Sequence, residues 1–455
     1  MAVLAERPRP RRVREHPRAG WFAVATVCFG AFMGQLDASI VTLTFPALQQ
    51  EFRAPLAAVQ WVSLSYLLAL VGLLVVAGRL ADATGRKLMY VWGFGVFTAA
   101  SVACGLAPGL GWLVVFRLVQ AVGAAMLQAN SVALVVGSVP RSRMRAALGV
   151  QAAAQALGLA LGPALGGLLV DTAGWRWVFL VNLPVGVLGL AAGRYLLPRT
   201  RERAPLARFD FPGLVLLAGG SAALLLALSG VSGLGLPAWV AAVPAAVAVA
   251  ALTGLVRWER RAAHPLVDLR LLRPRVVSLG LLGALCGYLV LFGPLTLFPQ
   301  VLGTHDGMGP VLTCLPAGFA VSAVLVDRLL PARLGVHGRT VLGAVVSALG
   351  CGLLLLAPGS APWVAAMLFL LGLGLGVFIP ANNSSIMGGI PSQMSATGGG
   401  MVNMARGLGS ALGIALVTLS LHLGGAAGPQ VAVAALAVCG VLAVAGAVSC
   451  ARESA

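Results

Sequence analysis

Long apolar stretches alternate with short polar ones along almost the whole chain. Each apolar stretch holds roughly 20 residues, which is enough for a helix to cross the hydrocarbon core of a bilayer. No polar stretch between them is long enough for a separate soluble domain. The pattern therefore predicts fourteen transmembrane helices, near residues 21–47, 57–77, 88–107, 111–138, 144–170, 177–197, 211–231, 238–256, 276–298, 309–330, 340–358, 363–388, 397–421 and 429–449.

Composition supports a membrane class and argues against a soluble protein. Hydrophobic residues make up 59% of the chain and charged residues only 10%. The mean hydropathy is +0.96. A soluble domain carries about 25% charged residues. An all-α integral membrane protein is the fold class that this composition favours.

The net charge of +18 would fit a nucleic-acid-binding protein. The placement of the cations along the chain argues against this. With the N-terminus in the cytoplasm, nearly all of the 31 Lys and Arg residues fall in loops and tails on that side. This asymmetry follows the positive-inside rule. It predicts cytoplasmic N- and C-termini and no nucleic-acid partner. The exceptions are Arg53 and Arg176 in outer loops, and Arg117 and Arg406 inside apolar segments.

The helices divide into two bundles of six with a two-helix insert between them. Gly123 before Asn130 in the first half is matched by Gly376 before Asn383 in the second, as expected for two diverged repeats. The pair at 211–231 and 238–256 has no counterpart and forms the insert. The predicted divisions are a basic tail at 1–20, an N-terminal bundle at 21–198, a linker with the two extra helices at 199–274, a C-terminal bundle at 275–450 and a tail at 451–455.

A polar loop with a defined order of residues, G-R-L-A-D-A-T-G-R-K, follows the second apolar segment at 78–87. It resembles the loop between helices 2 and 3 of the major facilitator superfamily, where a carboxylate and cations latch two bundles together. The resemblance implies a fold of two rocking bundles. Ala83 stands where the family commonly has a cation, so one latch contact is expected to be missing. Gly78 is expected to allow close helix approach, and Gly85 a tight turn. The predicted latch residues are Gly78, Asp82, Gly85, Arg86 and Lys87.

Asp37 is the one acid deep inside an apolar segment. A charge at that depth is costly and by default points to function. The surrounding sequence resembles the first-helix motif of fourteen-helix drug:proton antiporters, with Thr42 and Thr44 replacing an Asn and an Ala. This resemblance implies that Asp37 binds and releases the coupling proton. The alternative is an acid permanently paired with an arginine.

Arg117 is the candidate partner of Asp37. Helix rise places Arg117 roughly 9 Å and Asp37 roughly 15 Å below the same outer surface, at about 1.5 Å per residue. The two side chains are therefore within reach if their helices face each other. In the antiporters that the chain resembles, such an arginine takes part in proton transfer; here Ala121 replaces a usual glycine nearby. The alternative is that Arg117 merely extends to the outer interface.

Glycines recur every four residues in the fifth apolar segment. Such spacing gives a groove where another helix can approach closely. With the following Trp175-Arg176-Trp177 block, the segment resembles the antiporter motif of exporters. The resemblance favours export over import. The motif residues are Gly158, Gly162, Pro163, Gly166 and Gly167.

Polar and aromatic residues within the apolar segments are candidates for a substrate cavity, because such groups avoid lipid. Many are expected to form hydrogen bonds between helices instead. Segments nine to fourteen contain no acid at mid-span, which makes dicationic substrates less favourable than neutral, zwitterionic or singly charged ones. The candidates are Gln35, Gln60, Tyr66, Gln120, Gln128, Asn130, Asn383, Asn403 and Arg406.

No cofactor or metal is expected, because the seven cysteines and five histidines show no ligand spacing. No nucleotide-binding loop or nucleophile with a histidine partner indicates an enzyme. The expected partners are a small-molecule substrate, protons and the lipid bilayer, with the protein acting as a monomer in the plasma membrane. The predicted function is proton-coupled export of small amphipathic drugs, antibiotics or secreted metabolites. The alternatives are a permease or importer of a polar solute and, in another class, a membrane receptor.

Overall fold

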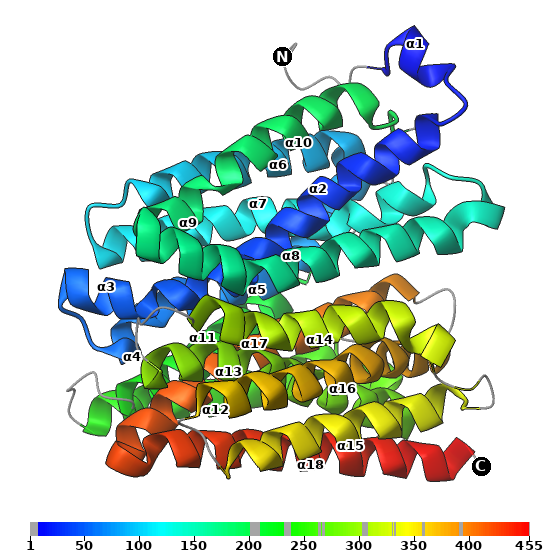
Figure 1. The fold of residues 1–455 in the computed structure, drawn as a ribbon. Helices are drawn as coiled ribbons and strands as arrows, with labels where there is room; N and C mark the ends of the chain where they lie inside the picture. The colour runs from blue at the N-terminus through cyan, green and yellow to red at the C-terminus, as the bar shows by residue number, and fades with distance from the viewer. Residues whose placement is uncertain are drawn as a thin grey trace. The chain divides into compact units, whose positions relative to one another are not determined.

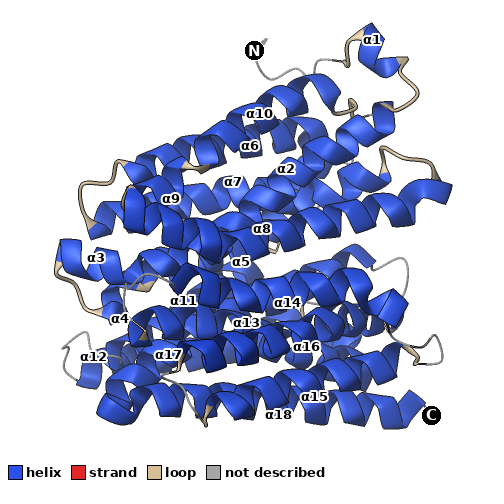
Figure 2. Cartoon of the chain, in the orientation of Figure 1, coloured by secondary structure: helices blue, strands red, loops and turns tan. Residues whose placement is uncertain are grey.

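All the secondary structure described in the computed structural model is helical (Figure 2). The helices follow the apolar segments closely, because in a bilayer every backbone polar group must be satisfied within the segment. The structure describes residues 8–200, 210–231, 238–262, 265, 269–302, 308–329, 331, 334–356, 360–390 and 395–454.

The chain forms two compact units, which are described separately (Figure 1). The first unit comprises residues 1–41 and 69–209. Its helices are α1 (Arg11–Arg14), α2 (Ala19–Ile40), the part of α5 (Trp61–Thr84) from Ala69 on, α6 (Arg86–Gly105), α7 (Leu110–Val136), α8 (Met144–Thr172), α9 (Arg176–Leu180) and α10 (Asn182–Leu196).

The second unit comprises residues 42–68 and 210–455. It holds the start of α5 and both predicted insert helices. Its other elements are α3 (Phe45–Phe52), α4 (Leu56–Val59), α11 (Phe211–Val231), α12 (Ala238–Glu259), η4 (Leu269–Leu272), α13 (Arg275–Val301), α14 (Met308–Leu329), α15 (Val336–Leu354), α16 (Ala361–Gly388), α17 (Ser395–Gly424) and α18 (Gly428–Ser454).

Twelve helical stretches in the described residues are long and apolar enough to cross a membrane. One of them, Gly398–Cys450, covers 53 residues and contains both α17 and most of α18. A shorter apolar stretch, Gly309–Ser322, lies in α14. Large apolar side chains such as Leu168 and Leu188 are more than half exposed. The chain is therefore a multi-pass membrane protein.

The first predicted segment, 21–47, is not one regular helix. α2 ends at Ile40, a 3₁₀ turn covers Val41–Thr44, and α3 starts at Phe45. Pro46 lies in the first turn of α3, where its missing N–H costs nothing. Inside a continuous helix the same proline would remove a hydrogen bond. The sequence prediction missed this interruption because Thr42 and Thr44 are the only polar residues between Ile40 and Leu48.

Glycines allow close packing between neighbouring helices in both units. In unit 1, a methyl group at Gly123 on α7 would lie 2.5 Å from the backbone nitrogen of Phe97 on α6. In unit 2, a methyl group at Gly374 on α16 would overlap the backbone of Ser347 on α15. Gly376 packs instead against Phe319 of α14. Gly374 thus makes the kind of close helix contact in unit 2 that Gly123 makes in unit 1, whereas Gly376 faces α14. The match of Gly123 to Gly376 stays a prediction.

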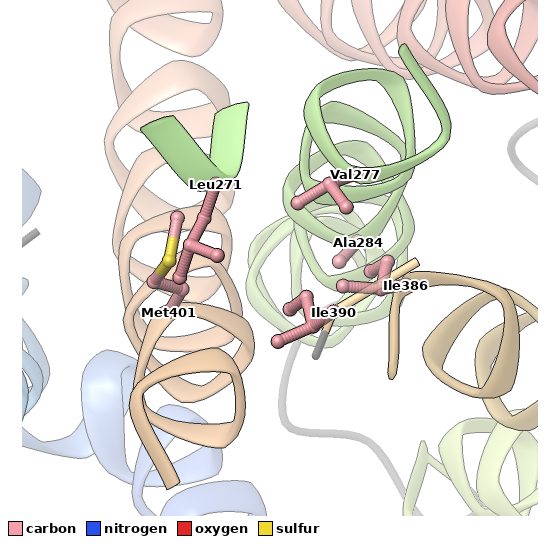
Figure 3. Packing of buried hydrophobic residues seen from close by; sticks show 6 residues of the cluster. All are labelled: Leu271, Val277, Ala284, Ile386, Ile390 and Met401. Carbon is pink, nitrogen blue, oxygen red and sulfur yellow. The ribbon is translucent and has the colours of Figure 1, made fainter. Parts of the chain in front are cut away.

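A buried apolar cluster in unit 2 shows how the turn before α13 is anchored (Figure 3). Leu271 from η4 packs beside Met401 of α17, and the two form one side of the cluster. Side chains from α13 and α16 form the other side. The cluster consists of Leu271, Val277, Ala284, Ile386, Ile390 and Met401.

The two insert helices pack against each other in unit 2. A methyl group at Gly220 on α11 would lie 3.1 Å from the Cβ of Ala251 on α12. At one end of the pair, Trp258 donates its indole N–H to Asp210 Oδ1 at 2.7 Å. The insert is therefore held by close approach of the two helices at Gly220 and by a partly buried hydrogen bond at one end.

Candidate functional site

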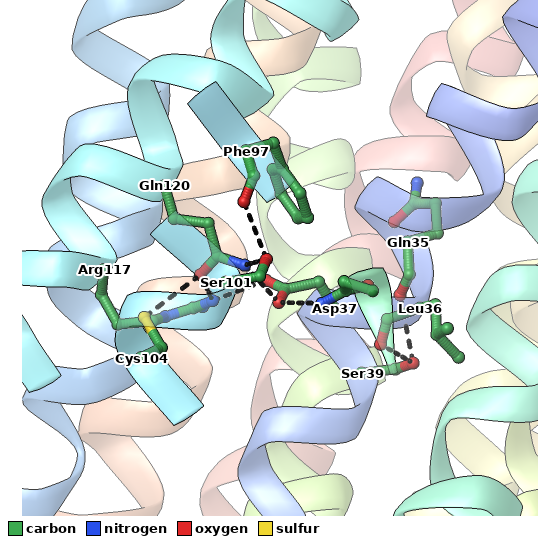
Figure 4. A network of polar contacts seen from close by, with 10 residues as sticks. Gln35, Leu36, Asp37, Ser39, Phe97, Ser101, Cys104, Arg117 and Gln120 are labelled. Carbon is green, nitrogen blue, oxygen red and sulfur yellow. Dashed lines mark hydrogen bonds and ion pairs between the residues drawn. The ribbon is translucent and has the colours of Figure 1, made fainter. Parts of the chain in front are cut away.

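The centre of the site is a buried ion pair between α2 and α7. Arg117 Nη1 lies 2.6 Å from Asp37 Oδ2, and the side chains are 1% and 0% exposed. Figure 4 shows the arginine and the acid pointing toward each other from these two helices. The sequence predicted that the two lie within reach, and the alternative of an arginine extending to the interface is wrong.

Gln120 bridges the two members of the ion pair. It lies one turn after Arg117 on α7, and its Oε1 accepts a hydrogen bond from Arg117 Nη1 at 2.6 Å. Its Nε2 donates to Asp37 Oδ1 at 2.9 Å and to Ser101 Oγ at 2.8 Å (Figure 4). The sequence placed Gln120 in a substrate cavity. The structure places its amide in the ion-pair network, where both of its polar atoms, Oε1 and Nε2, have partners.

Two further residues of the network come from helices that the sequence did not connect with Asp37. Ser101 on α6 accepts from Gln120 and donates to Phe97 O at 2.8 Å. Asn182, the first residue of α10, donates its Nδ2 to Asp37 Oδ1 at 3.3 Å and is fully buried. The sequence did contain a signal for Asn182, because an asparagine inside an apolar run near the Trp175–Trp177 block is unusual. Ser101 carries no comparable signal in the sequence.

Phe179 of α9 completes the surroundings of the arginine. The guanidinium carbon of Arg117 lies 5.9 Å from the centre of the Phe179 ring. A cation over an aromatic face is stabilised by the ring quadrupole, by about 2 kcal/mol when desolvated. The ion pair is therefore enclosed by polar partners on α2, α6, α7 and α10 and by a ring on α9, and it is sealed from solvent.

The loop at 78–87 has the turn that its glycines predict. α5 ends at Thr84 and α6 begins at Arg86, with Gly85 between them at φ +123°. Only glycine adopts that backbone conformation without strain. The backbone N–H of Lys87 donates to Thr200 Oγ1 at 3.4 Å, and the lysine is 3% exposed. Gly85 therefore allows the chain to reverse within a single residue.

The structure does not support a close contact at Gly78 and does not describe the side chain of Asp82. A methyl group at Gly78 would have its nearest neighbour in the described residues, the Cβ of Ala129, at an ordinary 3.9 Å. The close approach expected at Gly78 is thus not seen there. Asp82 lies on α5, but its side chain falls outside the described part of the structure. Its role as a latch stays a prediction.

The glycines of α8 allow close contact with α2, on the turns next to Asp37. A methyl group at Gly158 would overlap the carbonyl of Phe32, and one at Gly162 would overlap the hydroxyl of Ser39. Pro163 lies inside α8, which is assigned without interruption from Met144 to Thr172. Gly166 and Gly167 continue the same helix. The first two motif glycines therefore set the distance between α8 and the helix that carries the acid.

Replacing Gly158 by alanine should reduce transport activity and thermal stability. The added methyl meets backbone atoms of α2, which cannot move aside as a flexible side chain could, and such overpacking typically costs about 1–3 kcal/mol. Gly149→Ala on the same helix is the matched control, because a methyl there meets nothing within 4 Å. Thermal unfolding in detergent and transport in cells are the measurements. Equal behaviour of the two variants would show that the α2–α8 contact does not need Gly158.

The other cavity candidates belong to both units of the chain, and each has its own contacts within its unit. Gln60, fully buried, donates to Ser229 Oγ of α11 at 2.8 Å, and Asn130 donates to the carbonyl of Met126 on its own helix. Both therefore serve internal hydrogen bonds, as expected for many of the set. Arg406 on α17 lies over the ring of Tyr288 on α13, 5.9 Å from its centre.

The remaining cavity candidates differ in how far their side chains are buried. Tyr66 is buried, with 1% exposure. Gln35, Gln128 and Asn403 are partly buried. Asn383 is also partly buried, and its Oδ1 has no hydrogen-bond partner in the described part of the chain. No three His, Cys, Asp or Glu side chains among the described residues lie together in a way that would hold a metal ion.

Membrane-crossing helices, an ion pair buried between α2 and α7 and close helix contacts at glycines make the chain a multi-pass membrane protein with an ionisable site in its interior. The model of the Major Facilitator Superfamily matches residues 27–414, most of the chain. The chain belongs to this superfamily, so the protein is a multi-pass transporter and not an enzyme.

The chain is similar to known antibiotic and multidrug resistance proteins and to a solved transporter structure. It is 32% identical over 425 residues to the tetracenomycin C resistance and export protein of Streptomyces glaucescens, covering 90% of this chain and 78% of that protein. It is 33% identical over 404 residues to the multidrug resistance protein Stp of Mycobacterium tuberculosis, covering 85% and 73%. The crystal structure of the POT family transporter PepTSo has the same fold, with a TM-score of 0.71 at 15% identity over 97% of this chain and 98% of that one.

Proposed function

We propose that the protein exports small amphipathic antibiotics, drugs or secreted metabolites in exchange for protons, by alternating access. The observation that carries the proposal is the sealed Asp37–Arg117 pair with its hydrogen-bonded partners. Ionisable groups inside a membrane protein mark proton or substrate pathways. The names of the two relatives, one an antibiotic resistance and export protein and one a multidrug resistance protein, support the direction and the substrate class.

In the proposed cycle, Asp37 alternates between an ion pair and a neutral acid. With Asp37 ionised, Arg117 and Gln120 both donate to the carboxylate, and the site carries no net charge. Uptake of a proton neutralises Asp37 and leaves the arginine, which stays protonated at physiological pH, with its charge uncompensated. The free energy of the pair thus depends on the proton, and this dependence can bias the equilibrium between two conformations.

The proposal includes a topology of fourteen membrane-crossing helices with both termini in the cytoplasm. The 53 residues of Gly398–Cys450 are too many for one crossing and contain two helices, and α14 supplies a further crossing. The cationic loops then lie on one side, as the positive-inside rule requires. The protein is proposed to work as a monomer in the plasma membrane, with no cofactor and with the proton gradient as its energy source.

The test of export is drug susceptibility in an efflux-deficient bacterial host that expresses the protein. The panel should hold tetracenomycin C together with other polycyclic, neutral, zwitterionic and singly charged compounds. Resistance above that of the empty vector, at confirmed membrane expression, supports export. Uptake of a polar solute without any resistance would instead favour the permease alternative.

The same panel tests the predicted substrate charge. The sequence has no mid-span acid in segments nine to fourteen, so dicationic compounds lack a second counter-ion there. We expect resistance to singly charged or neutral members without resistance to matched dications. Protein-dependent accumulation of a dication against its gradient in everted vesicles would contradict this expectation.

Asp82→Asn should reduce export while the protein still reaches the membrane at a near-normal level. The substitution removes the charge that the family resemblance assigns to the latch but keeps the size of the side chain. Asp171→Asn is the control, since that acid lies exposed near the end of α8 in the same unit. Export is measured as resistance at matched protein levels. A parallel loss of protein and resistance would point to a folding role for Asp82.

A further inference from the structure

Asn182 has one polar atom that the network around Asp37 leaves unused. Its Nδ2 donates to Asp37 Oδ1 at 3.3 Å, while its Oδ1 is buried and has no hydrogen-bond partner in the described residues. The residue is 0% exposed, so bulk water does not satisfy this oxygen. Buried acceptors without a partner are uncommon in folded proteins and call for an explanation.

The orientation of the amide follows from the charge of its neighbour. An ionised carboxylate only accepts hydrogen bonds, so any amide facing it must present its nitrogen. Asp37 receives three donors in this way, from Arg117, Gln120 and Asn182. Three donors facing one carboxyl group is the arrangement that an ionised carboxylate requires, and it leaves the oxygen of Asn182 without a partner in the described residues.

Protonation reverses the requirement. A protonated carboxyl group has an O–H that needs an acceptor. The oxygen of Gln120 already accepts from Arg117 Nη1 at 2.6 Å, and turning that amide would point its NH₂ group at the guanidinium. The amide of Asn182 has no other hydrogen bond in the described residues, so it can turn by half a rotation and lose only its bond to Asp37. In the new orientation Oδ1 faces the acid.

The other charged or titratable groups near Asp37 offer no acceptor stronger than a thiol sulfur. In the described part of unit 1 these are Arg117 on α7, which has no acceptor atom, and the thiol of Cys104 on α6, 3.9 Å from Gln120 Oε1. Arg176 on α9 stacks on Trp175 at 4.4 Å. From α8 it is glycines, Gly158 and Gly162, that meet α2 near this level.

We propose that Asn182 exchanges roles with the proton on Asp37, donating to the carboxylate and accepting from the carboxylic acid. This inference rests on the proton-binding role proposed above for Asp37. Asn182 then acts as a positioning residue that stabilises both protonation states. Because Asn182 is the first residue of α10, a rotation of its amide occurs at the start of that helix. The preceding helix, α9, places Phe179 over Arg117. The segment 179–182 thus contacts both members of the ion pair.

The test uses a matched pair of variants, Asn182→Thr and Asn182→Val. The two side chains have the same shape, and only the threonine has a hydroxyl that can either donate or accept. The readout is pH-difference infrared spectroscopy of the full-length protein in liposomes, which needs no transported substrate. The C=O stretch of protonated Asp37 is identified as the band that Asp37→Asn removes.

We expect this band to move to higher wavenumber in Asn182→Val, where the acid has lost its acceptor, and to stay near the wild-type position in Asn182→Thr. Proton-driven export should fall roughly tenfold or more in the valine variant and much less in the threonine variant, the effect of losing one hydrogen bond to a charged group. An unshifted band in Asn182→Val would overturn the proposal. Absence of any Asp37 band in the wild type would instead refute the proton-binding role itself.

A second measurement covers the case in which Asn182→Val does not fold. Wild-type protein labelled with ¹³C in its asparagine side chains should show a side-chain amide band that changes with Asp37 protonation and is missing in Asn182→Thr. Labelled amides that do not respond to pH would overturn the proposal.

Discussion

Asp37→Asn should abolish proton-driven export, down to the level of membranes that lack the protein. Asparagine keeps the size of the side chain and still accepts a hydrogen bond through Oδ1, but it cannot take up or release a proton. Its NH₂ group replaces one carboxylate oxygen, so a donor on Arg117 or Gln120 loses its acceptor and the arginine keeps an uncompensated charge. The measurement is resistance, across the antibiotic panel, in an efflux-deficient host at matched membrane levels.

The control for this variant is again Asp171→Asn, which removes an exposed acid from the same unit and should leave resistance unchanged. If both variants behave like the wild type, Asp37 has no coupling role and the ion pair is structural. That outcome would correspond to the alternative of an acid permanently paired with its arginine. Loss of protein from the membrane would have to be excluded by quantifying it.

Arg117→Met should destabilise the protein strongly. The substitution leaves Asp37 buried without its counter-ion, and breaking a buried ion pair by removing one member costs about 3–5 kcal/mol. Methionine fills much of the volume of the arginine side chain, so packing against Phe179 is largely kept. The measurement is the apparent melting temperature of the purified protein in detergent, which should fall by several degrees.

The double variant Asp37→Asn with Arg117→Met separates charge from packing. Replacing both members removes the uncompensated charge, so we expect most of the lost stability to return, since a buried pair adds little net stability over a neutral replacement. Export should stay absent, because no proton-binding group remains. A double variant that is as unstable as Arg117→Met alone would show that the arginine acts through packing and not through its charge.

The pairing of Asp37 with Arg117 could be predicted from sequence because helix rise is constant and the bilayer fixes where helices end. Depth along the membrane was therefore available from simple counting. Rotation of each helix about its axis was not available in this way. The rotation of α7 determines that Gln120 points toward Asp37 and that Asn130 forms a hydrogen bond within its own helix. This rotation depends on packing between helices that are far apart in the sequence.

Among the short-range features of the chain, some could be predicted from the sequence and others could not. Gly85 was predicted to allow a tight turn, and its positive φ confirms this, because the requirement is local. The interruption after Ile40 was missed because apolar composition does not distinguish one long helix from two. Which glycine of α16 corresponds to Gly123 could not be decided from the sequence, because several glycines follow one another there and only contacts distinguish them.

The most direct test of the central claim is transport into everted membrane vesicles under an imposed pH gradient, acidic inside, with a compound from the panel that gives resistance. The proposal predicts accumulation with wild-type protein that collapses when the gradient is dissipated, together with proton release from the vesicle interior when the compound is added. Asp37→Asn vesicles should show neither effect. Accumulation that persists without the gradient, or in Asp37→Asn, would contradict proton-coupled export through this site.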